Sequence, residues 1–382
     1  MMEKAIVAPG MFQDFGGPRK TIGMFSKALD SVIYSFCDGV RIRDEGLTVE
    51  NSVPVESTVF PVGRQFLLPQ RKSIRSTEAV VAGSGLISCH MFYRHYALWV
   101  NKMYRKYETP YWFVPHGILD PWVMTKGALV KKAYWQLGGA RFLKEAKTVI
   151  CATTAERDKA AAHFDLPDAV VLPWPVELVV IDRREAVRLR LRCRLGIPVD
   201  AHLLLYFGRL HPMKQPLETI LALAAANVSN THLIIVGNED GVSVRECIEA
   251  AVKCGIEERV HVVGPVYGAE KYDYLLSSDA YISLSHRENF NHTAAESMAA
   301  GLPVLLSPGN DLLSEICRVS CFFEMEDNLV GPAADAIRRF SEKSKTELLE
   351  MGLCGRQWVE DFLSFDQFKE KLNTLACKYG RF

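Results

Sequence analysis

The chain has 382 residues, enough for two ordinary domains at roughly 100–200 residues per domain. Hydrophobic residues make up 48% and charged residues 24%, a composition that excludes wholesale disorder. The 45 Lys and Arg balance the 45 Asp and Glu. This argues against a nucleic-acid partner, because proteins that bind long nucleic acids usually carry a basic excess.

The cysteines and the N-terminus predict a cytoplasmic protein. Ten cysteines without a C-x-x-C pair are too dilute for a disulfide scaffold and are typical of reduced thiols. Residues 1–9 contain no apolar stretch long enough for a signal peptide, and no run of about 18 apolar residues occurs anywhere. We therefore expect a soluble protein that at most lies against the inner face of a membrane.

Short apolar runs alternate with helix-like segments along the whole chain. Buried strands are expected at residues 5–8, 79–82, 111–114, 148–151, 170–172, 203–207, 233–236, 260–263, 280–284 and 304–307. Helices are expected at residues 21–29, 129–146, 156–164, 216–227, 244–254, 272–277, 293–300 and 365–379. This alternation predicts an α/β protein with doubly wound parallel sheets that are covered by helices on both faces.

A break at Pro173-Trp174-Pro175 divides the strands into two sets, because this tripeptide can continue neither a helix nor a central strand. We expect an N-terminal domain over residues 1–175, a C-terminal domain over 176–360 and a final helical segment over 361–382. The Arg-rich stretch at 183–194 is interpreted as a solvated helix face. Two facing doubly wound domains would bind a ligand in the cleft at the carboxyl ends of their strands.

The strongest motif lies at residues 285–303, where a strand leads through a loop into a helix that stops at Gly301. Glu288 in the loop and Glu296 in the helix could bind vicinal hydroxyls of a sugar, because a carboxylate accepts two hydrogen bonds at once. The helix N-terminus offers N–H groups to a phosphate. Two ordinary alternatives remain. Thr293-x-x-Glu296 has the spacing of a capping box, and Glu288 has the character of a solvated loop charge.

Arg209 and Lys214 follow the apolar run at 203–207 and precede Pro216, a typical first residue of a helix. Two cations at a strand–loop–helix junction can neutralise a diphosphate without a metal, since Arg gives a forked contact and Lys a point charge. The alternative is an ordinary pair of basic surface residues.

Two weaker motifs occur in the first half. His116 stands between Pro115 and Gly117 after the strand at 111–114, and it either points into a cleft or bonds a neighbouring carbonyl. Gly16 and Gly17 follow the first strand, where adjacent glycines allow close approach of a ligand. The chain has no Asp-x-Asp, H-E-x-x-H or Cys/His cluster, so we expect no metal and no cofactor.

Taken together, these segments resemble glycosyltransferase family 4, the retaining enzymes with two facing Rossmann-like domains known as the GT-B fold. The order is the family's: a Gly-Gly loop, Pro-His-Gly at 115–117, Gly-Arg-Leu…Lys at 208–214, E-x7-E at 288–296, and Met-Ala-Ala-Gly-Leu-Pro-Val at 298–304. The resemblance implies that the final helix at 365–379 crosses back onto the first domain.

The resemblance also assigns roles to the motif residues. Glu296 would bind the donor ribose, Glu288 and His116 the transferred sugar, and Arg209 and Lys214 the diphosphate. The remaining substrate-binding positions that it implies are Gly16, Gly17, Val266, Asn289, Phe290, Asn291, His292 and Thr293.

The implied reaction is metal-independent transfer of a hexose-type sugar from a nucleoside-diphosphate sugar to an acceptor hydroxyl, with retention. The acceptor would be a glycan, a lipid-linked glycan or a small molecule. Two alternatives stay open, a nucleotide-sugar epimerase on the same scaffold and a non-catalytic sugar-nucleotide-binding protein. A nucleotide titration followed by an acceptor screen separates the three.

Two further features bear on the site and on membrane contact. Asn289 and Asn291 stand where the family often has Gly, and Asn tolerates the left-handed backbone better than other side-chain residues. The helix expected at 129–146 carries Lys131, Lys132 and Lys144 beside apolar residues. Such a helix can lie on anionic lipid, although a core-facing apolar stripe with a solvated back is the preferred interpretation.

Overall fold

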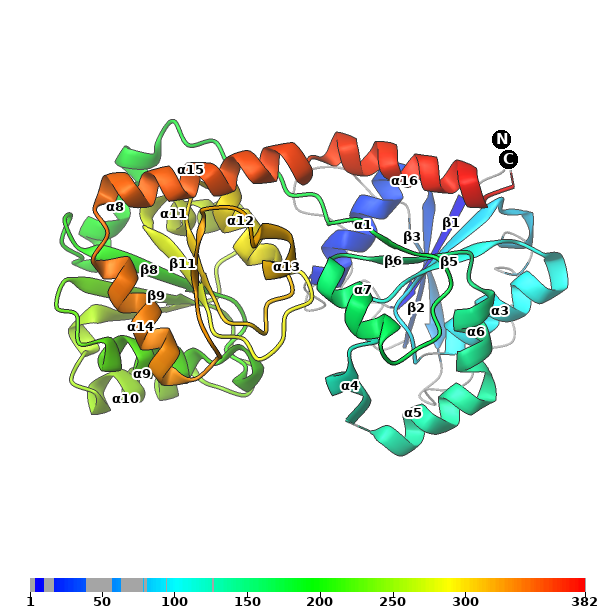
Figure 1. Cartoon of the computed structure of the whole chain (residues 1–382), viewed down its shortest axis with the longest axis horizontal. Helices are drawn as coiled ribbons and strands as arrows, with labels where there is room; N and C mark the ends of the chain where they lie inside the picture. The colour runs from blue at the N-terminus through cyan, green and yellow to red at the C-terminus, as the bar shows by residue number, and fades with distance from the viewer. Residues whose placement is uncertain are drawn as a thin grey trace. The chain divides into compact units, whose positions relative to one another are not determined.

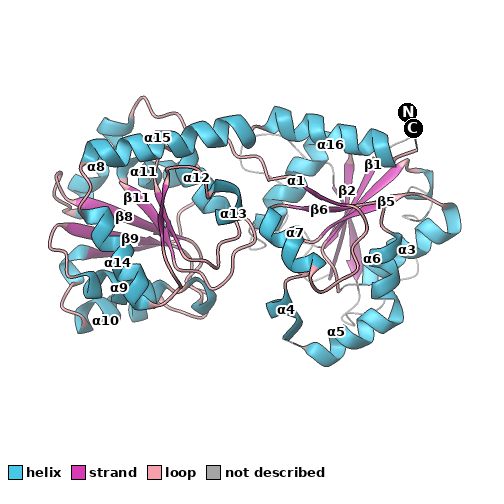
Figure 2. Ribbon diagram, viewed as in Figure 1, coloured by secondary structure: helices cyan, strands magenta, loops and turns pink. Residues whose placement is uncertain are grey.

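The computed structural model of the chain describes residues 4–9, 17–38, 57–62, 78, 81–93, 95–125 and 127–381. It divides into two compact units (Figures 1 and 2). The first combines Met1–Pro175 with Phe365–Phe382, and the second is Val176–Ser364.

The first unit is built on a seven-stranded parallel sheet with the order β3-β2-β1-β4-β5-β6-β7. Its strands are β1 (Lys4–Pro9), β2 (Val32–Asp38), β3 (Ser57–Val62), β4 (Leu86–His90), β5 (Tyr111–Val114), β6 (Val149–Cys151) and β7 (Ala169–Val171). Its helices are α1 (Gly17–Leu29), α3 (His95–Tyr107), α4 (Pro121–Thr125), α5 (Ala128–Tyr134), η3 (Trp135–Gly139), α6 (Ala140–Glu145), α7 (Thr154–Ala161) and α16 (Phe365–Tyr379).

Three strands of this sheet, β2, β3 and β4, were not among the predicted ones. The strand predicted at 79–82 is wrong where the structure describes it, because Val81 and Ala82 lie in a helical turn before β4. An apolar run of four residues fits a buried helical turn as well as a strand, so its pattern alone could not decide between them.

The single helix predicted at 129–146 is three helical pieces. The middle piece, η3, is a π-helical turn, and Gly138 inside it has φ 142°. Only glycine adopts such a backbone readily, and π-turns of this kind interrupt α-helices. The chain therefore changes direction between α5 and α6.

The last helix, α16, packs on α1 within the first unit. The Phe368 and Phe25 ring centroids are 5.2 Å apart, and Asn373 donates its Nδ2–H to the carbonyl of Ala28 at 3.1 Å. Trp174, from the predicted break, is buried against both phenyl rings. The tripeptide at 173–175 is thus anchored by aromatic packing in the first unit.

The second unit has a six-stranded parallel sheet with the order β10-β9-β8-β11-β12-β13. Its strands are β8 (His202–Phe207), β9 (Thr231–Val236), β10 (Val260–Gly264), β11 (Ala280–Ser283), β12 (Val304–Leu306) and β13 (Phe322–Glu324). Its α-helices are α8 (Arg184–Leu195), α9 (Pro216–Ala226), α10 (Val244–Lys253), α11 (Glu270–Ser277), α12 (His292–Ala299), α13 (Leu313–Ile316), α14 (Val330–Ser341) and α15 (Lys345–Phe362). Two 3₁₀ turns, η4 (Pro212–Lys214) and η5 (Glu257–Arg259), complete it.

The interpretation of 183–194 as a solvated helix face is wrong for part of that stretch. Arg192 is fully buried, and its guanidinium lies 2.8 Å from the carboxylate of Asp279. Arg188 and Lys345 pair with the same carboxylate at 2.6 and 2.7 Å. Their charges hold the pKa of Asp279 below its usual range against the opposing effect of burial. The cluster ties α8 and α15 to the start of β11.

A pair of stacked imidazoles between β9 and β10 makes the stability of the second unit pH-dependent. His232 Nδ1 lies 3.2 Å from His261 Nε2, and burial lowers the pKa of His232 to about 4. The unfolded chain binds this proton near pH 6.5, so stability is complete above that pH and is lost as pH falls toward 4.

We therefore predict that His232→Gln weakens the pH dependence of folding. The wild-type free energy of unfolding should fall by roughly 1–2 kcal/mol more than that of the variant between pH 7 and pH 5. Urea denaturation at the two pH values measures the difference. His163→Gln, at an exposed position in the first unit, is the control and should behave as wild type. Equal pH slopes in wild type and His232→Gln would contradict the assignment.

Candidate active site

Two charged loops of the second unit begin where β8 and β11 lie side by side. The chain runs outward from β8 through β9 to β10 and then returns to pair β11 with the other edge of β8. Successive loops therefore leave the sheet in opposite directions at this point. Open α/β sheets bind their ligands at such a switch point, at the carboxyl ends of the strands.

Lys214 and Glu288 meet at this switch point. The Lys214 Nζ atom is 2.5 Å from Glu288 Oε1, and their side chains are 17% and 14% exposed. The same Oε1 accepts the hydroxyl proton of Ser285 at 3.0 Å. Glu288 is thus a partly buried, hydrogen-bonded carboxylate, and its interpretation as a solvated loop charge is wrong.

The main chain on both sides of Glu288 is fixed by the segment that follows β12. The Glu288 N–H donates to the carbonyl of Gly309 at 2.7 Å, and Asp311 N–H donates to the carbonyl of Glu288 at 2.9 Å. A Cβ atom on Gly309 would lie 2.3 Å from the carbonyl oxygen of Ser285. Glycine is therefore required at 309 for this close approach, which holds the Glu288 loop in place.

Lys214 ends the 3₁₀ turn η4, whose start is capped by His211 through the Met213 N–H at 3.0 Å. Its stem lies against Gly208, where a Cβ atom would stand 3.3 Å from Lys214 Cδ. The small residue at the end of β8 thus leaves room for the ammonium group to reach Glu288.

Arg209 points to a different carboxylate. Its guanidinium pairs with Asp240, in the loop after β9, and the two side chains are 47% and 38% exposed. An ion pair this exposed contributes about 0–1 kcal/mol, so an incoming anion can replace the carboxylate at little cost. The Arg209 main chain is held through its carbonyl, which accepts the Tyr206 hydroxyl proton at 2.8 Å.

Glu296 does not form the capping box that its spacing allows. The helix α12 begins at His292, and its cap is Asn291, whose side-chain oxygen accepts the Ala294 N–H at 3.1 Å. The Glu296 carboxylate instead lies 3.1 Å from Lys271 Nζ of α11, and each side chain is 12% exposed. The capping-box alternative is therefore wrong.

The expected tolerance of Asn for a left-handed backbone is confirmed at Asn291, which has φ 52°, whereas Asn289 does not adopt positive φ. The Asn291 side chain is nearly buried and donates to Asn310 Oδ1 at 2.7 Å. Phe290 is buried as well, edge-on to His292 at 5.2 Å.

The remaining predicted positions of this unit are partly exposed. Asn289, His292 and Thr293 lie around the start of α12. Val266 follows the end of β10. Sequence reasoning missed Asp240 and Lys271, the partners of Arg209 and Glu296, because nothing in the local pattern links residues so distant along the chain.

In the first unit, His116 takes part in a chain of hydrogen bonds. Its Nε2 lies 2.9 Å from His90 Nδ1, His90 Nε2 lies 3.0 Å from Ser88 Oγ, and the Trp112 indole donates to the same Ser88 oxygen. Burial, with His116 beside it, lowers the pKa of His90 well below its ordinary value, so His90 is neutral.

The direction of this chain follows from the single hydroxyl proton of Ser88. The Trp112 indole can only donate, so Ser88 accepts that hydrogen bond. Ser88 therefore gives its own hydroxyl proton to His90 Nε2, because no other acceptor for this proton lies among the described residues. His90 then carries its proton on Nδ1 and donates it to His116 Nε2. The ring of His116 is thereby held with Nε2 as the acceptor.

Glu156 fixes the turn that carries His116, and it was not among the predicted residues. Its nearly buried carboxylate accepts the Gly117 N–H at 2.6 Å and the Ala152 N–H at 2.7 Å. His116 itself has φ 52°. Of the predicted glycines, Gly17 begins α1 and is partly buried, and Gly16 lies outside the described residues.

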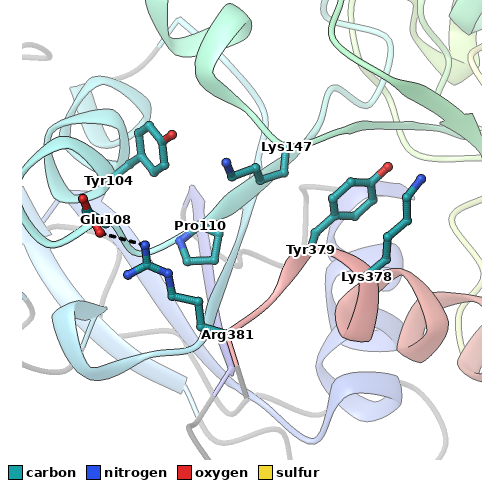
Figure 3. Close-up of a pocket in the computed structure, with 7 residues that line it drawn as sticks. All are labelled: Tyr104, Glu108, Pro110, Lys147, Lys378, Tyr379 and Arg381. Carbon is teal, nitrogen blue, oxygen red and sulfur yellow. Dashed lines mark hydrogen bonds and ion pairs between the residues drawn. The ribbon is translucent and has the colours of Figure 1, made fainter.

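A cavity of about 480 Å³ in the first unit lies away from these residues (Figure 3). Its wall includes Pro110 and Lys147, which precede β5 and β6, so it opens at the amino ends of the strands. Arg381 there pairs with Glu108 at 2.9 Å, and Lys378 pairs with Asp168 at 3.2 Å. Most of its cationic side chains thus already have a carboxylate partner.

None of the helices in the described part of the chain has the length and apolar character needed to cross a membrane. No group of three or more His, Cys, Asp or Glu side chains is placed there to hold a metal ion.

Parts of the chain are similar to known proteins. Residues 187–348, all in the second unit, match the family model described as glycosyl transferases group 1. The D-inositol 3-phosphate glycosyltransferase of Xylanimonas cellulosilytica is 30% identical over 177 residues, which cover 44% of this chain and 42% of that protein. The enzyme of the same name from Acidothermus cellulolyticus is 32% identical over 186 residues, covering 44% and 41%. The chain thus spans about two fifths of the length of these curated relatives.

Solved structures match over nearly the whole chain. Sucrose-phosphate synthase from Thermosynechococcus elongatus superposes with a TM-score of 0.76 at 18% identity, covering 98% of both chains. Anabaena HepE in complex with UDP gives 0.77 at 17% identity, covering 99% of this chain and 100% of that one. The fold is that of the GT-B glycosyltransferases. The matches to named glycosyltransferases support a glycosyltransferase enzyme.

We predict that Glu156→Gln destabilises the fold by about 1–3 kcal/mol. An amide can accept only one of the two N–H groups through its oxygen, and its NH₂ would face the other donor. The free energy of unfolding from urea titration measures the loss. Asp158→Asn, on the exposed side of the same helix, is the matched control and should change it by less than about 0.5 kcal/mol. A Glu156→Gln protein as stable as wild type would contradict the role given to this carboxylate.

Proposed function

We propose that the chain is a retaining glycosyltransferase that moves a hexose-type sugar from a nucleoside-diphosphate sugar to an acceptor hydroxyl. The observation that carries the proposal is the meeting of Lys214 and Glu288 at the switch point between β8 and β11, with Arg209 on the same loop as Lys214. The family model covers residues 187–348 of this same unit, and it and the curated glycosyltransferase relatives support the proposal.

The donor is best sought among uridine-diphosphate sugars. HepE is named in complexes with UDP, with UDP and glucose, and with UDP-glucose, and an Escherichia coli trehalose-6-phosphate protein is named with UDP-2-fluoro glucose bound. These neighbours share the fold at 12–17% identity. We propose a UDP-sugar as the first donor to test, with a glycan, a lipid-linked glycan or a small molecule as the acceptor.

The proposed catalysis is electrostatic. Each functional cation is neutralised by a carboxylate of the protein, Arg209 by Asp240 and Lys214 by Glu288. A diphosphate would take Arg209 from its exposed partner, whereas Lys214 is already fixed in position. As the bond from sugar to phosphate breaks, negative charge grows on the leaving diphosphate. Cations placed in advance stabilise that charge without reorganisation.

Retention would follow from reaction on one face of the sugar, with the leaving phosphate oxygen taking the proton of the acceptor hydroxyl. Orientation of acceptor and donor then supplies much of the rate. Glu288 would contact the transferred sugar, Glu296 the ribose, and His116 the sugar through a ring whose orientation is set by His90.

A titration with UDP, ADP and GDP, followed by an acceptor screen with UDP-glucose, tests the proposal. We expect one diphosphate to bind and its release from the sugar nucleotide to depend on an acceptor. Absence of binding to all three would overturn the proposal. Binding without turnover would favour a sugar-nucleotide-binding protein, and turnover without an acceptor would favour an epimerase.

Replacement of either cation should slow the reaction strongly. Lys214→Ala or Arg209→Ala is expected to lose about 2–4 kcal/mol of transition-state stabilisation, which is about 30–900-fold in kcat. Steady-state release of the nucleoside diphosphate measures it. Arg245→Ala, at an exposed position of α10, is the matched control and should leave kcat unchanged. Normal turnover in both site variants would rule out this mechanism.

The reaction is expected to need no divalent metal, because Arg209 and Lys214 supply the positive charge that the diphosphate requires. The rate in excess EDTA should stay within about two-fold of the rate with Mg²⁺ or Mn²⁺ added. A rate that vanishes with the chelator and returns with one of these ions would show that the two side chains do not suffice.

A further inference from the structure

The solvent-facing side of α5 and η3 in the first unit carries three large apolar side chains. Leu129, Val130 and Leu137 expose 85%, 73% and 79% of their surfaces. Val130 and Leu137 are about two helical turns apart and Leu129 adjoins Val130, so the three side chains line one face. Tyr134, on the other side of α5, is buried. The exposed face of this segment thus combines these three apolar side chains with the exposed polar side chains of Lys132 and Gln136. Leu129, Val130 and Leu137 together are called the apolar stripe.

A basic hollow adjoins the stripe at Leu137. It has a volume of about 440 Å³ between α3 and the η3–α6 segment, and Lys102, Arg105 and Arg141 stand in its wall. Within the described residues these three cations form no ion pair with a carboxylate, whereas neighbouring Lys106 pairs with Glu78 at 2.6 Å. Three of the four cations that line the hollow thus lack an ion-pair partner among the described residues, in a chain whose net charge is zero.

We propose that this surface, formed by Leu129, Val130, Leu137, Lys102, Arg105 and Arg141 and here called the basic-apolar face, docks on a membrane that contains anionic phospholipid. The partner must offer an apolar layer with negative phosphate groups at its boundary. A lipid surface has this combination. The exposed apolar side chains would enter the interface while the cations bind headgroup phosphates. The proposal goes beyond donor binding and shares no residue with it.

Two physical properties strengthen the choice of lipid as the partner. Lys132 and Lys144, also on this helical segment, are exposed and add to the positive potential near the stripe. Arg and Lys bind phosphate through charge-assisted hydrogen bonds, and a hollow that holds three of them suits a phosphate-bearing headgroup. A contiguous apolar stripe of this kind on a monomer marks an interaction site.

Flotation of the full chain with vesicles tests the proposal. With roughly one third phosphatidylglycerol in phosphatidylcholine, we expect the protein to float with the vesicles at low salt. We expect at least ten-fold weaker binding to phosphatidylcholine alone. The Lys102→Glu/Arg105→Glu/Arg141→Glu variant should lose binding to anionic vesicles. Leu129→Ser/Leu137→Ser should weaken binding at both low and high salt, because it removes the apolar contribution to membrane binding, which does not depend on salt.

Controls keep the test decisive. Arg245→Glu/Arg190→Glu/Arg194→Glu changes the net charge equally at exposed positions of the second unit and should bind vesicles as wild type does. UDP titration and the thermal midpoint show that each variant is folded. Equal binding to neutral and anionic vesicles, or full binding by the Lys102/Arg105/Arg141 variant, would overturn the proposal. The proposal would also be overturned if the wild type bound no vesicles but self-associated, and if Leu129→Ser/Leu137→Ser abolished that self-association. The partner of the basic-apolar face would then be a second copy of the chain.

Discussion

The pairing of β8 with β11 is the constraint on which the charged site of the second unit depends. Lys214 and Glu288 are 74 residues apart, yet their side chains meet at 2.5 Å because the two strands are neighbours and run in the same direction. The loops that follow them therefore begin at the same edge of the sheet. The first unit repeats this arrangement where β1 pairs with β4, the strand that ends at His90. In both units the strand order brings together the residues whose electrostatic surroundings are unusual.

The second unit contains both buried and exposed ion pairs, and the two kinds have different roles. Asp279 is 6% exposed and is surrounded by cations of the protein itself, so its charge is fully used in holding the fold. Removing one partner from such a buried cluster typically costs 3–5 kcal/mol. The Arg209–Asp240 pair is about half exposed and contributes little to stability. An exposed pair can exchange its partner for a ligand at little cost, and Arg209–Asp240 is an exposed pair that lies beside the switch point.

The sequence predicted much of this architecture because parallel strands buried on both faces are short apolar runs, as in Tyr111–Val114. It failed where the deciding contact lies far along the chain. Five segments have the Ser/Thr-x-x-Glu spacing of a capping box. Those at Ser243 and Ser344 form it, whereas Glu156, Glu288 and Glu296 instead bind groups from other elements. The spacing is the same in all five, so the local pattern could not show which carboxylates are used elsewhere.

The local pattern could not predict the burial of Arg192 either. Six arginines within 183–194 indicate an exposed helix, and only the fold brings Asp279, just before β11, against Arg192.

The same limit applies to His116. Its turn could be located from Pro115 and Gly117, but its hydrogen-bond chain through His90 needs the adjacency of β4 and β5. That chain gives the imidazole one tautomer and one orientation, fixed by buried neutral groups that do not titrate near neutral pH. The first unit thus holds a ring whose orientation is set in advance. The second unit holds Lys214, which is fixed against Glu288, and Arg209, whose exposed partner can be exchanged. A transferase that stabilises a leaving diphosphate uses groups that are oriented before the reaction, because such groups need no reorganisation as charge develops.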